Sequence, residues 1–167
     1  MTGFKAFTKQ DLPFNPLIAL DDEWMLISAE KDGKANTMTA SWGGFGILWS
    51  KPVAYIVLRP QRYTKEFVDA AERFSLSFFG GGQKKALGYL GTVSGRDSDK
   101  ISQTGLTLKS ENGVPYFEEA KTVLVCKKLF RQPMTAESFV VPEVARVNYP
   151  GGDFHTLYIG EIEQIRL

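Results

Sequence analysis

Short hydrophobic runs separated by glycine-containing turns make up most of the sequence. Residues 23–29 (EWMLISA) and 34–41 (KANTMTAS) read as two strands joined at Asp32-Gly33, a dipeptide that suits the positive φ angles of a tight hairpin. Phenylalanine and leucine alternate with serine over residues 73–79 (RFSLSFF), which predicts a strand with one buried face. Similar β-branched or aromatic runs predict strands over residues 53–59, 106–110, 114–117, 122–130 and 156–165.

Three short segments have helical patterns. Residues 64–71 place apolar side chains on one side, with Thr64 as the expected N-cap, and residues 83–90 and 97–104 follow as two more short helices. Because strands mostly follow one another without crossover helices, the pattern predicts a mainly β fold, a closed or split antiparallel β-barrel with a few short flanking helices. No repeat or long polar linker divides the chain, so residues 1–167 are expected to form a single domain.

Composition and charge narrow the class of protein. Hydrophobic residues make up 43% and charged residues 23% of the 167 positions, which is ordinary for a globular protein. A formal net charge of +1 gives no global field that would recruit nucleic acid or anionic lipid, so neither is an expected partner. A single cysteine, Cys126, excludes an intrachain disulfide and fits a reducing compartment; without a signal-like or membrane-spanning run, a cytoplasmic location is expected.

Several kinds of chemistry are excluded by missing residues. The sequence has no P-loop pattern, and its glycine-rich stretches at 43–46 and 80–82 do not form a dinucleotide-binding G-x-G-x-x-G frame. His155 is the sole histidine, so a multi-histidine metal site is impossible and no metal is expected. Any redox or group-transfer chemistry should therefore come from a bound organic cofactor.

The segment from Arg59 to Thr64 (RPQRYT) is the best candidate for an anion site. Here a predicted strand ends and a predicted helix begins, so free backbone N–H groups, Arg59 and Arg62 meet at a helix N-terminus, an arrangement that suits a monoester phosphate. In the alternative interpretation Thr64 is only an N-cap and the two arginines pair with surface carboxylates such as Glu66 and Asp69.

The strand over residues 36–42 alternates polar and apolar side chains and then meets a glycine-rich turn. Asn36, the strand backbone and Trp42 offer hydrogen bonds along the edge of a flat heteroaromatic ring and contact with its face. Alternatively, Trp42, Phe45 and Trp49 are core or subunit-interface residues. Their segment looks too irregular for a strand and too apolar to face water, so a second copy of the chain is expected to cover it.

Two further features have simple structural interpretations. Residues 94–100 (SGRDSDK) form a polar loop in which Asp97 or Asp99 caps the following turn, although Arg96 and Lys100 could instead reach a ligand phosphate or an anionic ring. Cys126 reads as a small buried hydrophobe, and we assign it no role.

Six segments, in this order and spacing, resemble the flavin reductase-like (flavoredoxin-like) family. They run across nearly the whole chain: residues 36–53 (NTMTASWGGFGILWSKPV), 59–67 (RPQRYTKEF), 94–100 (SGRDSDK), 105–108 (GLTL), 126–130 (CKKLF) and 158–162 (YIGEI). The resemblance implies a split β-barrel, a homodimer, and one FMN per subunit in a groove to which both subunits contribute.

The resemblance also implies roles for individual residues. Those expected along the isoalloxazine and ribityl chain are Asn36, Thr37, Met38 and Thr39, with Ser41 and Trp42 beside the cofactor. Those expected around the phosphate are Arg59, Arg62, Tyr63 and Thr64. Ser94, Arg96 and Lys100 match a loop that approaches the flavin, and His155 matches a histidine near the redox face. Residues 135–152 look least like the family and are expected over the open face of the flavin.

The implied activity is hydride transfer from NAD(P)H to flavin, followed by electron transfer to free flavin, a partner protein or oxygen. A flavoredoxin-type FMN electron carrier without NAD(P)H oxidation of its own is the alternative from another class. A split-barrel protein of the pyridoxine-phosphate-oxidase or haem-handling kind is a third possibility, which the sole histidine and the RPQRYT segment disfavour.

Overall fold

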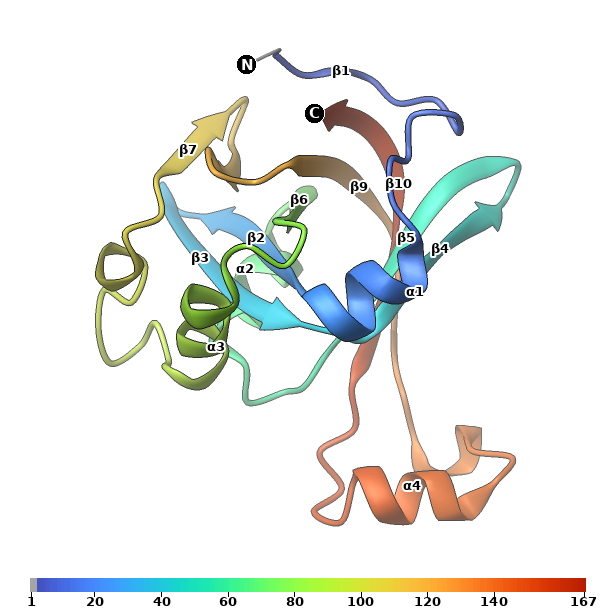
Figure 1. The fold of residues 1–167 in the computed structure, drawn as a ribbon. Helices are drawn as coiled ribbons and strands as arrows, with labels where there is room; N and C mark the ends of the chain where they lie inside the picture. The colour runs from blue at the N-terminus through green and yellow to red at the C-terminus, as the bar shows by residue number, and fades with distance from the viewer. Residues whose placement is uncertain (1–2) are drawn as a thin grey trace.

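The computed structural model describes residues 3–167, and an open antiparallel sheet forms most of it (Figure 1). The sheet order is β3-β2-β6-β9-β10-β5-β4, with β1 paired to β10, and the end strands β3 and β4 are not partners. The barrel is therefore split, which confirms the predicted fold class. The strands of this sheet are β1 (Lys5–Ala6), β2 (Met25–Lys31), β3 (Lys34–Ala40), β4 (Gly43–Leu48), β5 (Lys51–Leu58), β6 (Arg73–Phe78), β9 (Thr122–Pro133) and β10 (Thr156–Arg166).

Short helices and one hairpin flank the sheet. The hairpin is β7 (Leu108–Glu111) with β8 (Val114–Phe117). The helical elements are α1 (Pro16–Ile18), the π-helical turn η1 (Ala19–Glu23), α2 (Tyr63–Ala70), α3 (Lys84–Thr92), the 3₁₀ turns η2 (Ser102–Thr104) and η3 (Ala136–Ser138), and α4 (Pro142–Asn148). No helix in residues 3–167 is both long enough and apolar enough to cross a membrane.

The predicted hairpin between β2 and β3 is confirmed. Its turn residues, Asp32 and Gly33, have φ angles of 52° and 73°, the left-handed conformation that this dipeptide tolerates well. The register then pairs Asn36 with Ala29 and Met38 with Ile27, so the polar strand of the candidate site is held in register against β2 at one end of the sheet.

Residues 43–48 form a regular strand, so the prediction of an irregular segment was wrong. This strand, β4, pairs with β5 across a tight turn at Trp49 and Ser50, whose φ angles are 53° and 57°. The glycines hid the strand pattern but have a packing role, because a Cβ added to Gly44 would lie 2.4 Å from the ring of Tyr55. Ile47 is 67% exposed on this hairpin.

The alternation in β6 also has a different meaning from the predicted one. Phe74 and Leu76 pack in the main core, yet Ser75 and Ser77 are fully buried too. The serine face is covered because the β7–β8 hairpin lies over it, and Ser75 donates a hydrogen bond to the carbonyl of Pro115. Both faces of the central strand are therefore buried, and a second hydrophobic cluster lies beneath α3 and this hairpin.

Two of the three predicted helices form. The helix expected over residues 97–104 is reduced to the turn η2, because the side chains of Asp99 and Ser102 bond to each other's backbone and compete with helix formation. Asp99 accepts a bond from the backbone N–H of Ser102 at 3.4 Å, but the N-cap position of this turn is Ile101, which has no side-chain cap. Thr64, the expected N-cap of α2, lies inside the first turn instead, and Arg62 occupies the N-cap position without a side-chain cap.

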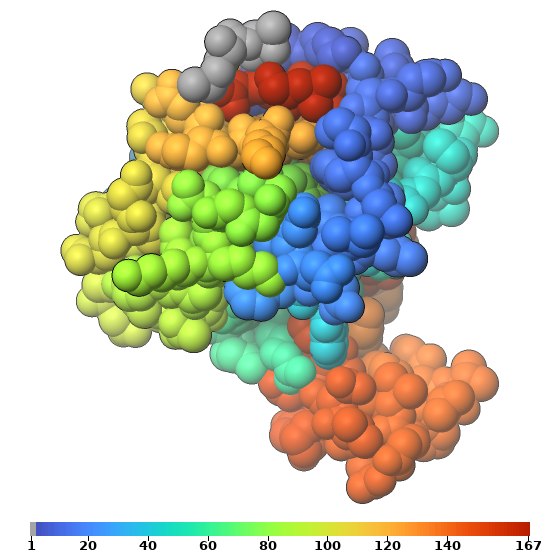
Figure 2. Space-filling model, in the orientation of Figure 1, coloured from blue at the N-terminus to red at the C-terminus, as the bar shows by residue number. Residues whose placement is uncertain are grey.

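The connection between β9 and β10 forms an arm that projects from the barrel. The arm, residues 134–155, contains η3 and α4, and Figure 1 shows α4 well away from the sheet. In the space-filling view the arm forms a separate lobe below the body (Figure 2). Val140 on its outer surface is 96% exposed.

Candidate functional site

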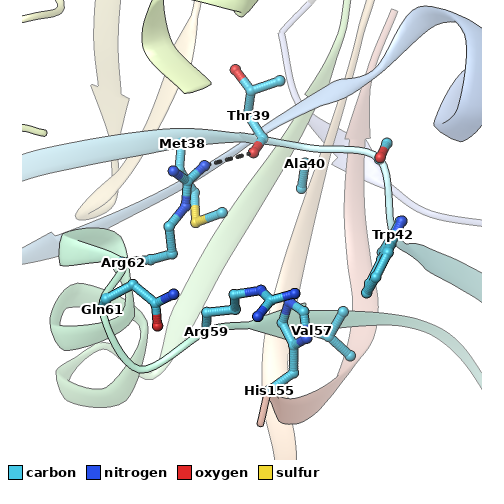
Figure 3. A pocket seen from close by; sticks show the side chains of 10 residues that line it. Met38, Thr39, Ala40, Trp42, Val57, Arg59, Gln61, Arg62 and His155 are labelled. Atoms are coloured by element: carbon cyan, nitrogen blue, oxygen red, sulfur yellow. Dashed lines mark hydrogen bonds between the residues drawn. The ribbon is translucent and has the colours of Figure 1, made fainter. Parts of the chain in front are cut away.

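A cavity of about 370 Å³ lies where the end of β3, the end of β5 and the start of β10 approach one another (Figure 3). This volume is in the range of pockets that hold cofactors and other small organic ligands. The residues that line it are Met38, Thr39, Ala40, Ser41, Trp42, Val57, Arg59, Gln61, Arg62 and His155. Seven of these ten were predicted as site residues, all except Ala40, Val57 and Gln61.

A smaller polar cavity of about 70 Å³ adjoins the first. The two cavities share Met38, Gln61 and Arg62. The small cavity also brings together five of the seven remaining predicted residues, Asn36, Tyr63, Thr64, Ser94 and Lys100, with Thr92, Val93 and Gly95. None of the described residues that line it is acidic.

Arg62 lies between the two cavities and is held by two backbone carbonyls. Its Nη1 donates to the carbonyl of Gly91 at 2.7 Å, and its Nη2 donates to the carbonyl of Thr39 at 3.2 Å, the bond drawn in Figure 3. Removal of the guanidinium from water lowers the pKa of Arg62 below its usual value. The positive charge is therefore partly desolvated, and no carboxylate in residues 3–167 forms an ion pair with it.

Lys100 adds a buried cation to the small cavity, beside the half-buried Arg62. Its Nζ donates to the carbonyls of Leu90 and Val93, both at 2.9 Å, at the end of α3. Burial, and then repulsion by Arg62, lower the pKa of Lys100 to about 8. Two cations line one small cavity, both are removed from water to some extent, and the charge of Arg62 lowers the pKa of Lys100. Such a site favours a bound anion.

Asn36 and Thr64 are directly bonded in the wall of the small cavity. The Asn36 Nδ2 group donates to the Thr64 Oγ1 atom at 3.0 Å, and both side chains are buried. The hydroxyl oxygen of Thr64 is thus an acceptor in this bond, which leaves its own proton free to donate to a ligand.

Arg59 lines the larger cavity and is tied to the arm. It pairs with Asp153 at 2.5 Å, donates to the carbonyl of Asn148 at 2.8 Å, and lies over the ring of Tyr149. The alternative in which both arginines pair with surface carboxylates holds for Arg59, although its partner is Asp153 and not Glu66 or Asp69. It does not hold for Arg62, whose bonds go to backbone carbonyls.

His155 lies at the wall of the larger cavity and is 8% exposed. Its Nδ1 atom is 2.7 Å from the hydroxyl oxygen of Tyr149, and its ring centroid is 5.3 Å from that of Trp42. Burial, and then the charge of Arg59, lower the pKa of His155 to about 4. The imidazole is therefore neutral at physiological pH.

Two predicted residues do not reach either cavity. Thr37 is fully buried on the other face of β3, where its hydroxyl donates to the carbonyl of Ile27. Arg96 lies at the surface, pairs with Glu66, and stacks over the ring of Tyr63. Within this chain Arg96 therefore supports the wall of the small cavity from outside.

Some lining residues were missed by sequence reasoning. Gln61 lies between the two arginines of the RPQRYT segment, so its position in the sequence could have identified it as a site residue. Val57 is an ordinary strand residue whose side of the sheet depends on the unpredicted pairing with β4 and β10. Thr92 and Val93 close the small cavity at the end of α3, and nothing local marks them as site residues.

The arm reaches the site only at its base. A third cavity of about 680 Å³ shares Ser41, Trp42 and Val57 with the first, and Met134 and Tyr149 at the two ends of the arm line it. None of residues 135–152 lines the 370 Å³ cavity. The expectation that they lie over the open face of a flavin stays a prediction.

Other proteins share this architecture. A flavoredoxin from Methanosarcina acetivorans superposes with a TM-score of 0.65 at 22% identity, over 86% of this chain and 67% of that one. The FMN-binding protein from Thermus thermophilus with bound p-hydroxybenzaldehyde gives 0.67 at 24% identity, over 99% and 81%. An NADH:FAD oxidoreductase from Streptomyces globisporus gives 0.62 at 20% identity, over 86% and 74%. These likenesses show the split-barrel fold.

Sequence comparison identifies the family. No curated protein matches the chain. The model of the flavin reductase like domain, in contrast, matches residues 21–167, which include the whole candidate site and all but the first strand of the sheet. The chain belongs to the flavin reductase-like domain family.

Proposed function

We propose that this protein binds FMN, with the phosphate in the small cavity and the ring in the larger one. The observation that supports this most strongly is the occurrence of the half-buried Arg62 and the buried Lys100 in one cavity whose lining, among residues 3–167, holds no acidic residue. Burial of unpaired charge is costly, and a phosphate dianion between the two cations would remove most of that cost. The hydroxyl of Thr64 and that of Ser94 are further donors in the same cavity.

The larger cavity fits the flat part of a flavin in its chemistry. Its wall combines the backbone of β3 at residues 39–41, apolar contacts from Met38 and Val57, and the ring of Trp42. Such a wall can hydrogen-bond the edge of a ring system and exclude water from its face. Flavin supplies the ability to accept a hydride and to pass electrons on, so no protein nucleophile is required.

The activity we propose is NAD(P)H-dependent flavin reduction. In this reaction the chain's own residues orient the two ring systems and shield them from water, while His155 stays neutral at the cavity wall. An FMN electron carrier of flavoredoxin type is the second candidate, which the likeness to the Methanosarcina acetivorans flavoredoxin favours. Anaerobic stopped-flow mixing separates them, since only the reductase bleaches flavin absorbance rapidly with NADH or NADPH.

We also propose that the protein is a homodimer whose interface includes the β4–β5 hairpin. Ile47, Leu48, Trp49, Tyr55 and Phe130 form a partly exposed apolar group there. A monomer would leave this surface in water, whereas a two-fold contact would bury it.

The identity of the cofactor is tested by spectrum and mass. The purified protein should be yellow, or become so with FMN, and the released cofactor should have the mass of FMN. Haem, FAD alone, or no bound flavin after titration with FMN would each contradict the proposal.

A further inference from the structure

The sole histidine has a dedicated hydrogen-bond partner that comes from the arm. The hydroxyl of Tyr149 lies 2.7 Å from Nδ1 of His155, and both side chains are buried, with exposed fractions of 7% and 8%. Tyr149 follows α4 directly, and His155 precedes β10, so the two residues hold the base of the arm together. A neutral imidazole carries its one ring proton on either Nδ1 or Nε2. If Nδ1 accepts a hydrogen bond, the proton is on Nε2; if Nδ1 donates one, the proton is on Nδ1.

The surroundings favour a bond in which Tyr149 is the donor. Burial raises the pKa of Tyr149, so its hydroxyl stays protonated, and the lowered pKa of His155 keeps the ring neutral. The other acceptor near this hydroxyl is the thioether of Met134 at 3.9 Å. An imidazole nitrogen is a far better acceptor than a thioether, so the hydroxyl proton points to Nδ1.

The other ring nitrogen faces the cavity. His155 lines the 370 Å³ cavity, and no protein group in residues 3–167 bonds its Nε2 atom. The one side-chain polar atom in these residues that is both fully buried and without a partner is Oγ of Ser77 in the core, so Nε2 keeps access to the cavity. A proton on Nε2 is thus available to a ligand.

We propose that Tyr149 is a positioning residue that holds His155 in the Nε2–H form, so that His155 presents a neutral donor to a carbonyl oxygen bound in the larger cavity. A neutral donor of this kind polarises a carbonyl or an amide oxygen without transferring its proton. The proposal that the ligand is a carbonyl or carboxamide compound rests on the proposed function. The proposal that His155 carries its proton on Nε2 does not.

The contacts of Tyr149 allow its hydroxyl to be removed alone. Its ring packs against Phe154 with centroids 5.0 Å apart and against Phe139 at 5.7 Å, and the guanidinium of Arg59 lies 4.9 Å above it. Tyr149→Phe keeps these ring contacts and removes the donor to Nδ1. The matched control is Tyr116→Phe, in the β7–β8 hairpin far along the chain from the arm, which keeps its own contact with Phe4.

The test is a long-range ¹H–¹⁵N correlation spectrum of the ¹⁵N-labelled protein at pH 7, with and without FMN. Because His155 is the only histidine, its two ring nitrogens give the only imidazole signals. We expect Nδ1 to resonate as an unprotonated nitrogen and Nε2 as a protonated one. In Tyr149→Phe the two signals should move toward each other as both forms become populated, and Tyr116→Phe should leave them unchanged.

A wild-type spectrum with the proton on Nδ1 would overturn the inference, even if Tyr149→Phe failed to fold. An unchanged spectrum in folded Tyr149→Phe would also overturn it. FMN binding is measured separately by quenching of flavin fluorescence. A protein that shows the expected Nε2–H form but does not bind FMN would refute the proposed function and leave the role of Tyr149 intact.

Discussion

The side chains of Asn36 and Thr64 are joined by a 3.0 Å hydrogen bond that links β3 to the first turn of α2. The bond fixes the hydroxyl of Thr64 in the wall of the small cavity, with its proton free for a ligand. The sequence predicted a polar strand containing Asn36 and, separately, a helix that starts at Thr64 near two arginines. The hydrogen bond joins a residue from each of these two segments.

Thr64→Val should weaken FMN binding by about 1.5–3 kcal/mol, the scale of a hydrogen bond to a charged group, and leave riboflavin binding almost unchanged. It should also lower the free energy of unfolding by about 1–3 kcal/mol, because the buried amide of Asn36 loses its acceptor. Thr64→Ser is the control that retains the hydroxyl. Fluorescence titration and urea unfolding measure the two effects, and equal losses for FMN and riboflavin would show that Thr64 does not contact the phosphate.

FMN binding should be coupled to proton uptake by Lys100. Its pKa of about 8 leaves the amine about half neutral near pH 8, and a phosphate dianion beside it would raise that pKa. About half a proton per FMN should therefore be taken up near pH 8. Calorimetry in buffers of different ionisation enthalpy measures this uptake. Riboflavin with wild type and FMN with Lys100→Met should show none, and a buffer-independent heat for FMN with wild type would contradict the site.

The depressed pKa of His155 predicts a loss of stability in mild acid. His155 binds a proton near pH 6.5 in the unfolded state and only near pH 4 in the folded state. The contribution of His155 to the free energy of unfolding is therefore complete above pH 6.5 and is lost as the pH falls toward 4. The charges that face the ring are Arg59 and Arg62, which oppose its protonation, and Asp153, which favours it. The full loss is up to about 3 kcal/mol.

Carboxylates also titrate between about pH 4 and 6.5, so the part of the pH dependence that comes from His155 has to be separated from theirs. The variant His155→Gln does this because it removes only the imidazole. Urea unfolding of wild type and variant between pH 7 and pH 4.5 should show a smaller pH dependence in the variant. Parallel curves would mean that His155 titrates normally in the folded protein.

Ile47→Lys should shift the proposed dimer toward monomer and weaken FMN binding with it. A lysine at this exposed position on β4 would have to be buried in an apolar contact between copies. Ser110→Lys, on the exposed hairpin strand β7, is the control for added charge. Sedimentation equilibrium with and without FMN measures the effect. A wild-type monomer of about 18.6 kDa with full FMN affinity would refute the shared site.

The sequence predicted the parts of the fold that depend on local pattern. The hairpin at Asp32-Gly33 and the strands of the central sheet follow from turn chemistry and hydrophobic alternation. The hydrophobic pattern did not predict β4, because the glycines in this segment are typical of a loop. In the structure, Gly44 leaves room for the ring of Tyr55. The pattern also failed at β6, because burial of Ser75 depends on a hairpin about 40 residues away along the chain.

In the candidate site, too, the sequence predicted residues that a local pattern marks and missed contacts between residues far apart in the chain. Arg62 and Thr64 were predicted because the end of a strand and the start of a helix are visible locally. Arg59 was grouped with them, yet it pairs with Asp153, 94 positions away in a segment without a recognisable pattern. Tyr149 was not identified for the same reason, since only the folded arm brings it to His155.

The most direct test of the proposed cofactor site compares FMN with riboflavin on wild type and Arg62→Ala, with Arg146→Ala on the exposed face of the arm as control. The two ligands share the ring system and differ in the phosphate. The account predicts that Arg62→Ala raises the dissociation constant of FMN by about 10- to 150-fold and that of riboflavin by less than about twofold. Equal loss of both ligands, or no loss of either, would contradict a phosphate site at Arg62 and Lys100.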